Sequence, residues 1–252
     1  MKTEAVLNNM YANAPLVFGH RGAQAYAPPN TLPAFQLAVE QGAHGSELDV
    51  HRSKDGHPVV IHDFSVDATT DGSGHVADLT LAELKALDAG GWYAPGYAGV
   101  TIPTLDEVFE AVGKHLFINI EIKSNTQETD GVEQVVAECI RRHAMEERVI
   151  VSAFNPLALR RFRDLMPDVP IGFLYAKDSP DSAHALIADF AVEALHPEDI
   201  LINPLLVEKA HNAGQRVNAW TVNDVEQARQ LVEMGVDCII TDAPDRILAA
   251  LV

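Results

Sequence analysis

Acidic side chains stand at the ends of two predicted strands, where they can bind a metal ion. Glu47 and Asp49 are two residues apart on one strand, so both point to the same face. Glu121 ends another strand. Taken singly, each acid is most simply a partner in a surface ion pair. Three converging carboxylates, however, repel one another unless a cation compensates. Oxygen ligands suit Mg²⁺ or Ca²⁺, with Mn²⁺ as a further option, so we expect one divalent cation.

Two histidines and two basic residues stand beside these acids in the predicted strand ends. His20 and His62 can serve as general acid and base, because histidine titrates near neutral pH. A lone histidine at a strand end is more often structural, and most of the eleven histidines must be so. Arg21 and Lys123 supply the cations that a phosphate group requires. Ordinary ion pairing with neighbouring carboxylates is the alternative for both.

The elements that must position these residues alternate between strands and helices. The expected strands are residues 16–19, 46–50, 59–62, 116–122, 149–153, 171–175, 194–196, 217–222 and 238–241. Helical patterns follow several of them, at 32–41, 131–143, 156–166, 204–213 and 225–234. This alternation predicts a parallel sheet, and so many units favour a closed α/β barrel, the TIM (β/α)₈ fold. A doubly wound sheet is disfavoured because no GxGxxG follows the first strand. On a barrel the carboxyl ends of the strands share one face.

The strand count exceeds the eight of a barrel by one. The link between the strands at 46–50 and 59–62 is too short for a helical crossover. We therefore expect an irregular return or a hairpin around residues 54–56. Residues 64–101 are rich in Gly, Asp and Thr and contain one short helical pattern near 81–87. We expect a single barrel domain over residues 1–252, with a small lobe inserted at 64–101, after the third strand, that caps the active site.

The bulk composition limits the partners. The formal net charge is −18 and no run of Lys or Arg occurs, so we expect no nucleic-acid binding. The same acidity disfavours stable membrane association. Two cysteines outside any CxxC pair predict free buried thiols. No leader-like or membrane-spanning apolar run is apparent, so we expect a cytoplasmic location. The sequence makes no prediction of the oligomeric state.

An ordered set of short motifs resembles the glycerophosphodiester phosphodiesterase family, bacterial cytoplasmic type. Each motif alone is weak, but the set covers almost the whole chain in order. The motifs are H-R-G at 20–22, A-P-P-N-T at 27–31, E-L-D-V at 47–50, H-D at 62–63, E-I-K at 121–123, N-A-W-T-V at 218–222 and T-D-A-P at 241–244. The resemblance implies a TIM barrel that hydrolyses glycerophosphodiesters to glycerol 3-phosphate and an alcohol.

The resemblance also implies a role for each candidate residue. His20 and His62 would be the acid/base pair, and Arg21 and Lys123 would hold the phosphate. One divalent cation would be bound by Glu47, Asp49 and Glu121. Trp220 would line the pocket beside the glycerol or the leaving group, although a barrel-core position explains it nearly as well. Which histidine is the acid stays open, as does the choice between water and a neighbouring hydroxyl as nucleophile.

Two departures from the family pattern and three rival functions remain. Pro29 stands where the family usually has Glu, and Ala68 where many members have Arg. A phospholipase of D type, acting on lysophospholipids, would use the same site. A lyase or aldolase would use Lys123 as its reactive amine. A non-catalytic barrel that binds phosphorylated ligands would lack a metal ligand or a histidine, and all five of these residues are present.

Overall fold

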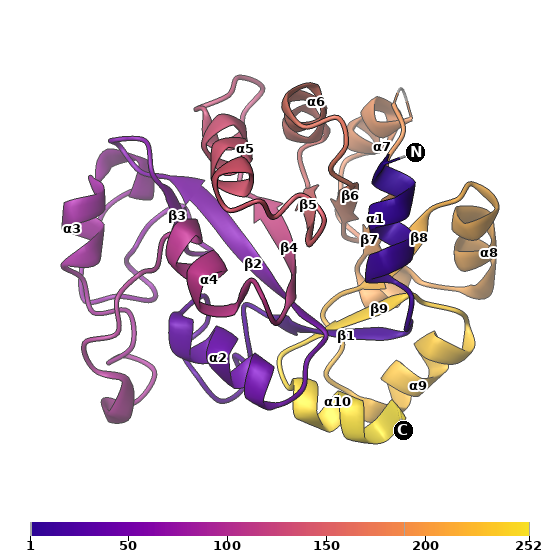
Figure 1. Ribbon diagram of the computed structural model, residues 1–252, viewed down its shortest axis with the longest axis horizontal. Coiled ribbons are helices and arrows are strands. Elements are labelled where there is room, and N and C mark those ends of the chain that lie inside the picture. The colour runs from indigo at the N-terminus through magenta and orange to yellow at the C-terminus, as the bar shows by residue number, and fades with distance from the viewer. Residues whose placement is uncertain (1, 189, 252) are drawn as a thin grey trace.

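The computed structural model describes residues 2–188 and 190–251, and its sheet contains eight parallel strands that close on themselves (Figure 1). Around the barrel the order is β1 (Leu16–His20), β2 (Gly45–Arg52), β4 (Phe117–Ile122), β5 (Val149–Ala153), β6 (Ile171–Tyr175), β7 (Ala194–Pro197), β8 (Arg216–Ala219) and β9 (Cys238–Thr241). The barrel closes because β1 pairs in parallel with both β2 and β9. The predicted (β/α)₈ barrel is therefore confirmed.

The surplus strand lies outside the barrel. Strand β3 (Pro58–Val60) pairs antiparallel with β2, with Val50 opposite Val60. The turn between them contains Gly56 at a φ of 89°, a conformation that glycine adopts without strain. The expected hairpin is thus present. The barrel passes directly from β2 to β4, so the segment that follows β3 extends from a hairpin arm and not from a barrel strand.

The helices alternate with the barrel strands and surround them (Figure 1). They are α1 (Lys2–Met10), α2 (Leu32–Glu40), α3 (Leu81–Lys85), α4 (Leu105–Val112), α5 (Val132–Arg142), α6 (Pro156–Leu165), α7 (Asp181–Ile187), α8 (Pro204–Asn212), α9 (Val225–Glu233) and α10 (Pro244–Leu251). Short 3₁₀ turns occur at η1 (Val76–Asp78), η2 (Pro95–Tyr97) and η3 (Asp199–Leu201). Within residues 2–188 and 190–251, no helix has the length and apolarity needed to cross a membrane.

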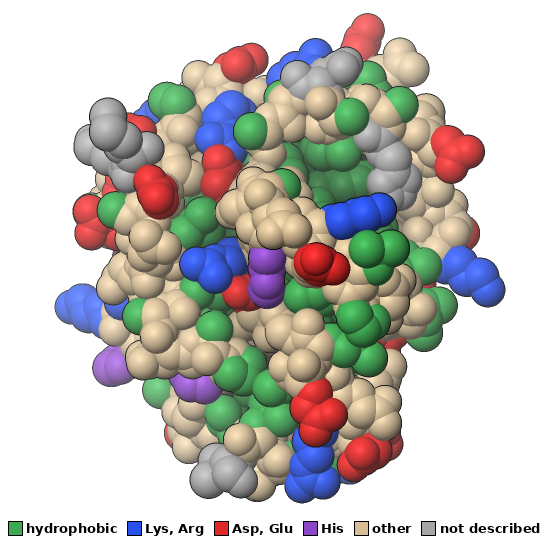
Figure 2. Space-filling model, turned by 90° about the vertical axis from the view of Figure 1, so that its right-hand side faces the viewer, with side chains coloured by type: hydrophobic (Ala, Val, Ile, Leu, Met, Phe, Trp, Pro, Cys, Tyr) green, Lys and Arg blue, Asp and Glu red, His purple; other side chains and the backbone are tan. Residues whose placement is uncertain are grey.

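Helix α1 lies across the amino-terminal ends of the barrel strands. Met10 and Tyr11 pack in one buried cluster with Leu16, Phe18 and Cys238 from the barrel. Figure 2 views the molecule from this side, and the Lys and Arg side chains there are scattered and form no continuous patch. The polar strand ends described below lie at the opposite end of the barrel, so α1 closes the core on the side away from them.

Residues 64–101 form a segment beside the barrel, with α3 at its outer edge (Figure 1). Its side chains share a small hydrophobic cluster with β3 that includes Val59, Val66 and Leu84. Two hydroxyl groups bond it to the chain that follows β1: Tyr93 donates to the Gln24 carbonyl at 3.1 Å, and Tyr97 to the Tyr26 carbonyl at 2.9 Å. The segment is therefore fixed on the β1 side of the barrel mouth.

Candidate active site

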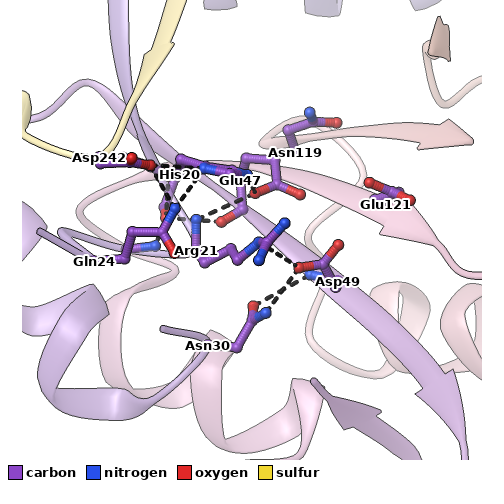
Figure 3. Close-up of polar contacts among 12 residues, drawn as sticks. His20, Arg21, Gln24, Asn30, Glu47, Asp49, Asn119, Glu121 and Asp242 are labelled. Atoms are coloured by element: carbon purple, nitrogen blue, oxygen red, sulfur yellow. Dashed lines mark hydrogen bonds and ion pairs between the residues drawn. The ribbon is translucent and has the colours of Figure 1, made fainter. Parts of the chain in front are cut away.

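The chain makes a tight turn directly after β1. Arg21 has a φ of 54° and Gly22 a φ of 85°. A Cβ on Gly22 would lie 2.5 Å from the Ala34 backbone carbon of α2, so only glycine fits there. The turn aims the Arg21 backbone N–H at Glu47, which accepts it at 3.2 Å (Figure 3). His20 and Arg21 are thereby placed beside Glu47 of the neighbouring strand β2.

The three acids that the sequence singles out converge. Asp49 on β2 is the register partner of Glu121 on β4, and Glu47 lies one pleat before Asp49. One carboxylate oxygen from each of the three lies within 4.8 Å of the others, and all three side chains are buried. Lys123 Nζ is 2.7 Å from Glu121 Oε1 and 3.1 Å from Asp49 Oδ1, while Arg21 Nε is 3.2 Å from Asp49 Oδ2. Three buried anionic groups are thus paired with two cations.

The electrostatics of the cluster reflect this deficit of positive charge. Burial, with Asp49 and Glu121 nearby, raises the pKa of Glu47 well above its usual range. Burial also raises the pKa of Glu121 to about 7, despite the opposing effect of Lys123. For Asp49 burial acts in the same direction, but Lys123 and Arg21 outweigh it and hold the pKa below its usual range. A further cation between the three carboxylates would relieve the repulsion that Glu47 and Glu121 experience.

Asp49 is also held by an amide that the sequence reasoning did not select as a site residue. Asn30 Nδ2 donates to Asp49 Oδ2 at 2.7 Å, and the Asp49 backbone N–H donates to Asn30 Oδ1 at 3.3 Å (Figure 3). Asn30 has a φ of 58°, a left-handed conformation that asparagine tolerates better than most residues. Its place in the A-P-P-N-T motif was the available signal.

His20 is oriented by a second residue that was not predicted for the site, Asp242, which directly follows β9. His20 Nδ1 lies 2.8 Å from Asp242 Oδ1, and its Nε2 lies 3.9 Å from Glu47 Oε2 (Figure 3). The Asn223 amide donates to the other Asp242 oxygen at 2.6 Å, and the Gln24 amide also donates to Asp242. Burial raises the pKa of Asp242, but these hydrogen bonds outweigh it and lower the pKa. An ionised Asp242 accepts the Nδ1 proton and leaves Nε2 facing the acidic cluster.

His62 has a similar partner in a more open setting. It lies two residues beyond β3, and its Nδ1 is 2.7 Å from Asp63 Oδ1. Its side chain is 39% exposed, against 15% for His20. Burial lowers the pKa of His62. The loop that carries His62 is held in place because His51 Nε2 donates to the His62 carbonyl at 3.0 Å. The two histidines thus reach the same cavity from different elements, His20 from β1 and His62 from the chain after β3.

A cavity of about 250 Å³ opens above these residues. It is lined by His20, Arg21, Glu47, His62, Glu121, Phe154, Leu174, Trp220 and Ile240. The charged lining comes from β1, β2, β4 and the β3 hairpin, and the apolar lining from β5, β6, β8 and β9. Trp220 donates from its indole nitrogen to the His196 carbonyl at 2.8 Å and meets Phe154 edge-on. The sequence left the position of Trp220 open, and the structure places it in this cavity.

The structure therefore brings all eight predicted site residues to one end of the barrel. Six of them line the cavity, whereas Asp49 and Lys123 lie buried behind it in ion pairs. None of the described residues in 64–101 lines this cavity. Thr69 and Ala89 of that segment line a separate cavity of about 60 Å³, together with Pro29 and His62.

The chain is similar to known phosphodiesterases over most of its length. A model of the glycerophosphoryl diester phosphodiesterase family matches residues 20–246. The glycerophosphodiester phosphodiesterase of Caldanaerobacter subterraneus subsp. tengcongensis is 44% identical to this chain, over 92% of this chain and 96% of its own length.

Solved structures are similar over the same extent. A phosphodiesterase of Oleispira antarctica in complex with the product sn-glycerol-3-phosphate is 33% identical, with a TM-score of 0.87 over 96% of this chain and 98% of the other. The glycerophosphodiester phosphodiesterase of Agrobacterium tumefaciens is 29% identical, with a TM-score of 0.80 over 94% of this chain and 99% of the other. The chain therefore belongs to the glycerophosphoryl diester phosphodiesterase family of phosphoric diester hydrolases.

Proposed function

We propose that this chain hydrolyses glycerophosphodiesters to glycerol 3-phosphate and an alcohol in the cavity above Glu47, with one divalent cation. The charge balance of the site carries the proposal. Three buried carboxylates face two cations, which leaves one negative charge without a partner. A divalent cation would turn this into one net positive charge, which matches the single negative charge of a phosphodiester.

The donor set fits such a cation. Glu47, Asp49 and Glu121 offer only oxygen ligands, which favour Mg²⁺, Ca²⁺ or Mn²⁺ over zinc, and no histidine belongs to the cluster. Asp49 Oδ1 contacts the Lys123 amine at 3.1 Å and has no other partner in the part of the chain that is described, so it keeps a lone pair for a ligand role. When bound, the cation would polarise a phosphoryl oxygen and stabilise the charge that develops on it.

Two basic residues would bind the phosphate. Arg21 uses Nε toward Asp49, and its guanidinium has further N–H donors in a fixed planar arrangement that suits phosphate oxygens. Lys123 is held between Asp49 and Glu121, which raises the pKa of its amine above the usual range and keeps it charged. Asp49 therefore orients both cations before the substrate arrives.

The two histidines would transfer the protons. Asp242 and Asp63 each accept a hydrogen bond from Nδ1 of one histidine, so Nε2 is the atom left for proton transfer on both. One histidine removes a proton from the attacking hydroxyl or water, and the other donates a proton to the departing alkoxide. His20 ends β1 and His62 follows β3, and both line the same cavity, so each could serve one side of a phosphorus atom bound there.

A second candidate is D-type hydrolysis of lysophospholipids. The apolar lining of Phe154, Leu174 and Trp220 favours it, since these side chains can contact an acyl chain. Comparing turnover of glycerophosphocholine with that of detergent-solubilised lysophosphatidylcholine separates the two. We expect the water-soluble diester to be the better substrate.

Metal dependence tests the main proposal. EDTA treatment should abolish turnover of glycerophosphodiesters, and Mg²⁺, Ca²⁺ or Mn²⁺ should restore it. Glu47→Gln and Glu121→Gln should weaken binding of the metal, measured by calorimetry, without unfolding the barrel. Full activity in a sample shown to be metal-free by elemental analysis contradicts the proposal.

A further inference from the structure

A second hollow adjoins the catalytic cavity. It has a volume of about 380 Å³ and lies among the loops that follow β4, β5 and β6. Phe154 lines both this groove and the catalytic cavity, so the two adjoin at that side chain. The polar wall of the groove begins at Ser124, the residue after Lys123. A phosphate bound in the catalytic cavity would therefore have one ester arm next to the groove.

We propose that this groove binds the alcohol half of the diester and selects uncharged, hydroxyl-bearing alcohols such as glycerol or a cyclitol. The inference rests on the proposed diesterase function. It concerns which alcohol is accepted and not how the phosphodiester bond is broken.

The groove is preformed on the side nearest the phosphate. Asn155 Nδ2 donates to Ser124 Oγ at 3.1 Å and to the Thr126 carbonyl at 2.8 Å. Asn155 Oδ1 in turn accepts the Leu157 N–H at 3.0 Å and so caps helix α6. These bonds join the loop after β4 to the start of α6. The groove wall is thus part of the scaffold, and binding there requires little ordering of the protein.

The walls present groups that recognise hydroxyls. The side chains of Asn125, Gln127 and Ser182 line the groove, are exposed, and have no hydrogen-bond partner within residues 2–188 and 190–251. The lining also includes apolar side chains, with Phe154 38% and Leu186 36% exposed. Amide and hydroxyl groups can donate to and accept from alcohol oxygens, while the apolar side chains contact the carbon skeleton.

The groove lacks the groups that recognise a charged alcohol. No Asp, Glu, Lys or Arg occurs among the described residues that line it. A choline or ethanolamine cation is recognised by a carboxylate or by several aromatic faces, and here Phe154 and Trp220 meet at 89°, with no third ring at the groove. A cationic alcohol would therefore lose its hydration without gaining a partner.

Among the described residues, the other side of the mouth has a cavity that is too small for the alcohol. The cavity beside Pro29, His62 and Thr69 measures about 60 Å³, room for a few water molecules. The alcohol arm therefore occupies the groove on the Phe154 side, away from residues 64–101.

Three diesters that differ only in the alcohol test the proposal: glycerophosphoglycerol, glycerophosphocholine and glycerophosphomethanol. The methyl ester is too short to reach the groove. For the wild type, kcat/KM should be at least about fivefold higher for glycerophosphoglycerol than for glycerophosphocholine. Ser182→Asp places a carboxylate in the groove and should shift this ratio about threefold to fivefold toward choline, as expected for an exposed charge pair.

Matched controls separate the possible outcomes. Ser182→Asn adds a polar group without charge and should leave the ratio unchanged. Both variants should hydrolyse the methyl ester at the wild-type rate, because Ser182 lies outside the catalytic cavity. Hydrolysis of all three diesters with choline preferred, or with a ratio that Ser182→Asp does not move, overturns the groove assignment and leaves the diesterase function standing. No hydrolysis of any of the three, methyl ester included, refutes the diesterase function itself.

Discussion

The two halves of the barrel mouth differ in how their side chains are held. On the β1, β2 and β4 half, the polar side chains have partners: Asp49 contacts Asn30, Arg21 and Lys123, and His20 contacts Asp242. On the β5, β6, β8 and β9 half, the lining side chains are apolar and held by packing, with one hydrogen bond from the Trp220 indole to the His196 carbonyl. Under the proposed function, the first half would fix charges for chemistry, whereas the second would shape the space for the rest of the substrate.

The largest expected effect on kcat comes from the half of the barrel mouth that carries the charged side chains, called the charged half below. His20→Ala and His62→Ala should each lower kcat by roughly a hundredfold or more, as expected for lost general acid–base catalysis. Metal affinity should change little, since neither histidine belongs to the carboxylate cluster. Steady-state kinetics with saturating metal, together with calorimetric metal titration, measures both. A near-normal kcat in either variant means that its histidine has another role.

Replacing the two carboxylates that orient the histidines should have a smaller effect on kcat. The effect should also differ between the two carboxylates. Asp242→Asn and Asp63→Asn keep the size of the side chain but remove the charge that fixes the Nδ1 proton. The His20–Asp242 pair is the more buried, with side chains 15% and 27% exposed, against 39% and 44% for His62 and Asp63. We expect about a tenfold loss of kcat for Asp242→Asn and less for Asp63→Asn, because exposed pairs contribute less.

The pH profile gives this comparison a second readout. A merely structural role for Asp242 predicts a lower melting temperature and an unchanged pH–rate profile. An orienting role predicts a shifted profile with an unchanged melting temperature. Equal losses of kcat in the two asparagine variants would contradict the inequality expected from burial.

The sequence predicts the barrel better than it predicts the partners within the site. Strands such as β5 and β6 have the bounds expected, because strands buried on both faces are continuous apolar runs bounded by turn residues. Asn30 and Asp242 were missed as site residues. Their roles depend on a left-handed turn and on a contact across 222 positions of sequence, and strand periodicity carries no information about either.

The barrel interior supplies a prediction for stability. His196 on β7 is fully buried, its Nε2 lies 2.9 Å from the Asn218 amide, and burial lowers its pKa from the ordinary 6.5 to about 3. Gly172 on β6 makes room for the ring, because a Cβ there would lie 2.3 Å from Nε2. The folded state thus keeps His196 neutral at pH values at which the unfolded chain is protonated.

This difference sets the sign of the pH dependence. The contribution of His196 to stability is complete above pH 6.5 and is lost as the pH falls toward 3. The slope is about 1.4 kcal/mol per pH unit in that window. Denaturant unfolding at several pH values should show a weaker acid dependence for His196→Gln than for the wild type. Parallel curves for the two proteins would show that the folded state accommodates a charged His196.

Substitutions on the apolar half of the mouth, formed by β5, β6, β8 and β9, should affect substrate binding more than the chemical step. Trp220→Ala removes a ring that lines the cavity and meets Phe154 at 5.5 Å between ring centroids. We expect about a fivefold rise in KM with a smaller change in kcat. Trp220→Phe, which keeps an aromatic surface, should restore most of the affinity. A drop in kcat comparable with that of the histidine variants would place Trp220 in the chemistry and break the division into two halves.

The smallest expected effect concerns Pro29, where the charged half departs from the family pattern. Pro29 lines the small cavity that it shares with Arg21, His62 and Asp63. A carboxylate at this position would compete with phosphate for the donors of Arg21 that Asp49 leaves unused. In the proposed mechanism, proton transfer and metal ligation involve other residues. We therefore expect an active wild type and, for Pro29→Glu, a rise in KM of about threefold with little change in kcat.

Proline also fixes φ, so Pro29→Gln is the control: it frees the backbone without adding charge and should resemble the wild type. Steady-state kinetics on one glycerophosphodiester at saturating metal compares the three proteins. A wild type inactive with every metal and rescued by Pro29→Glu would instead show that the charged half needs a carboxylate here, one that Asp63, with its oxygen 2.7 Å from His62, does not replace.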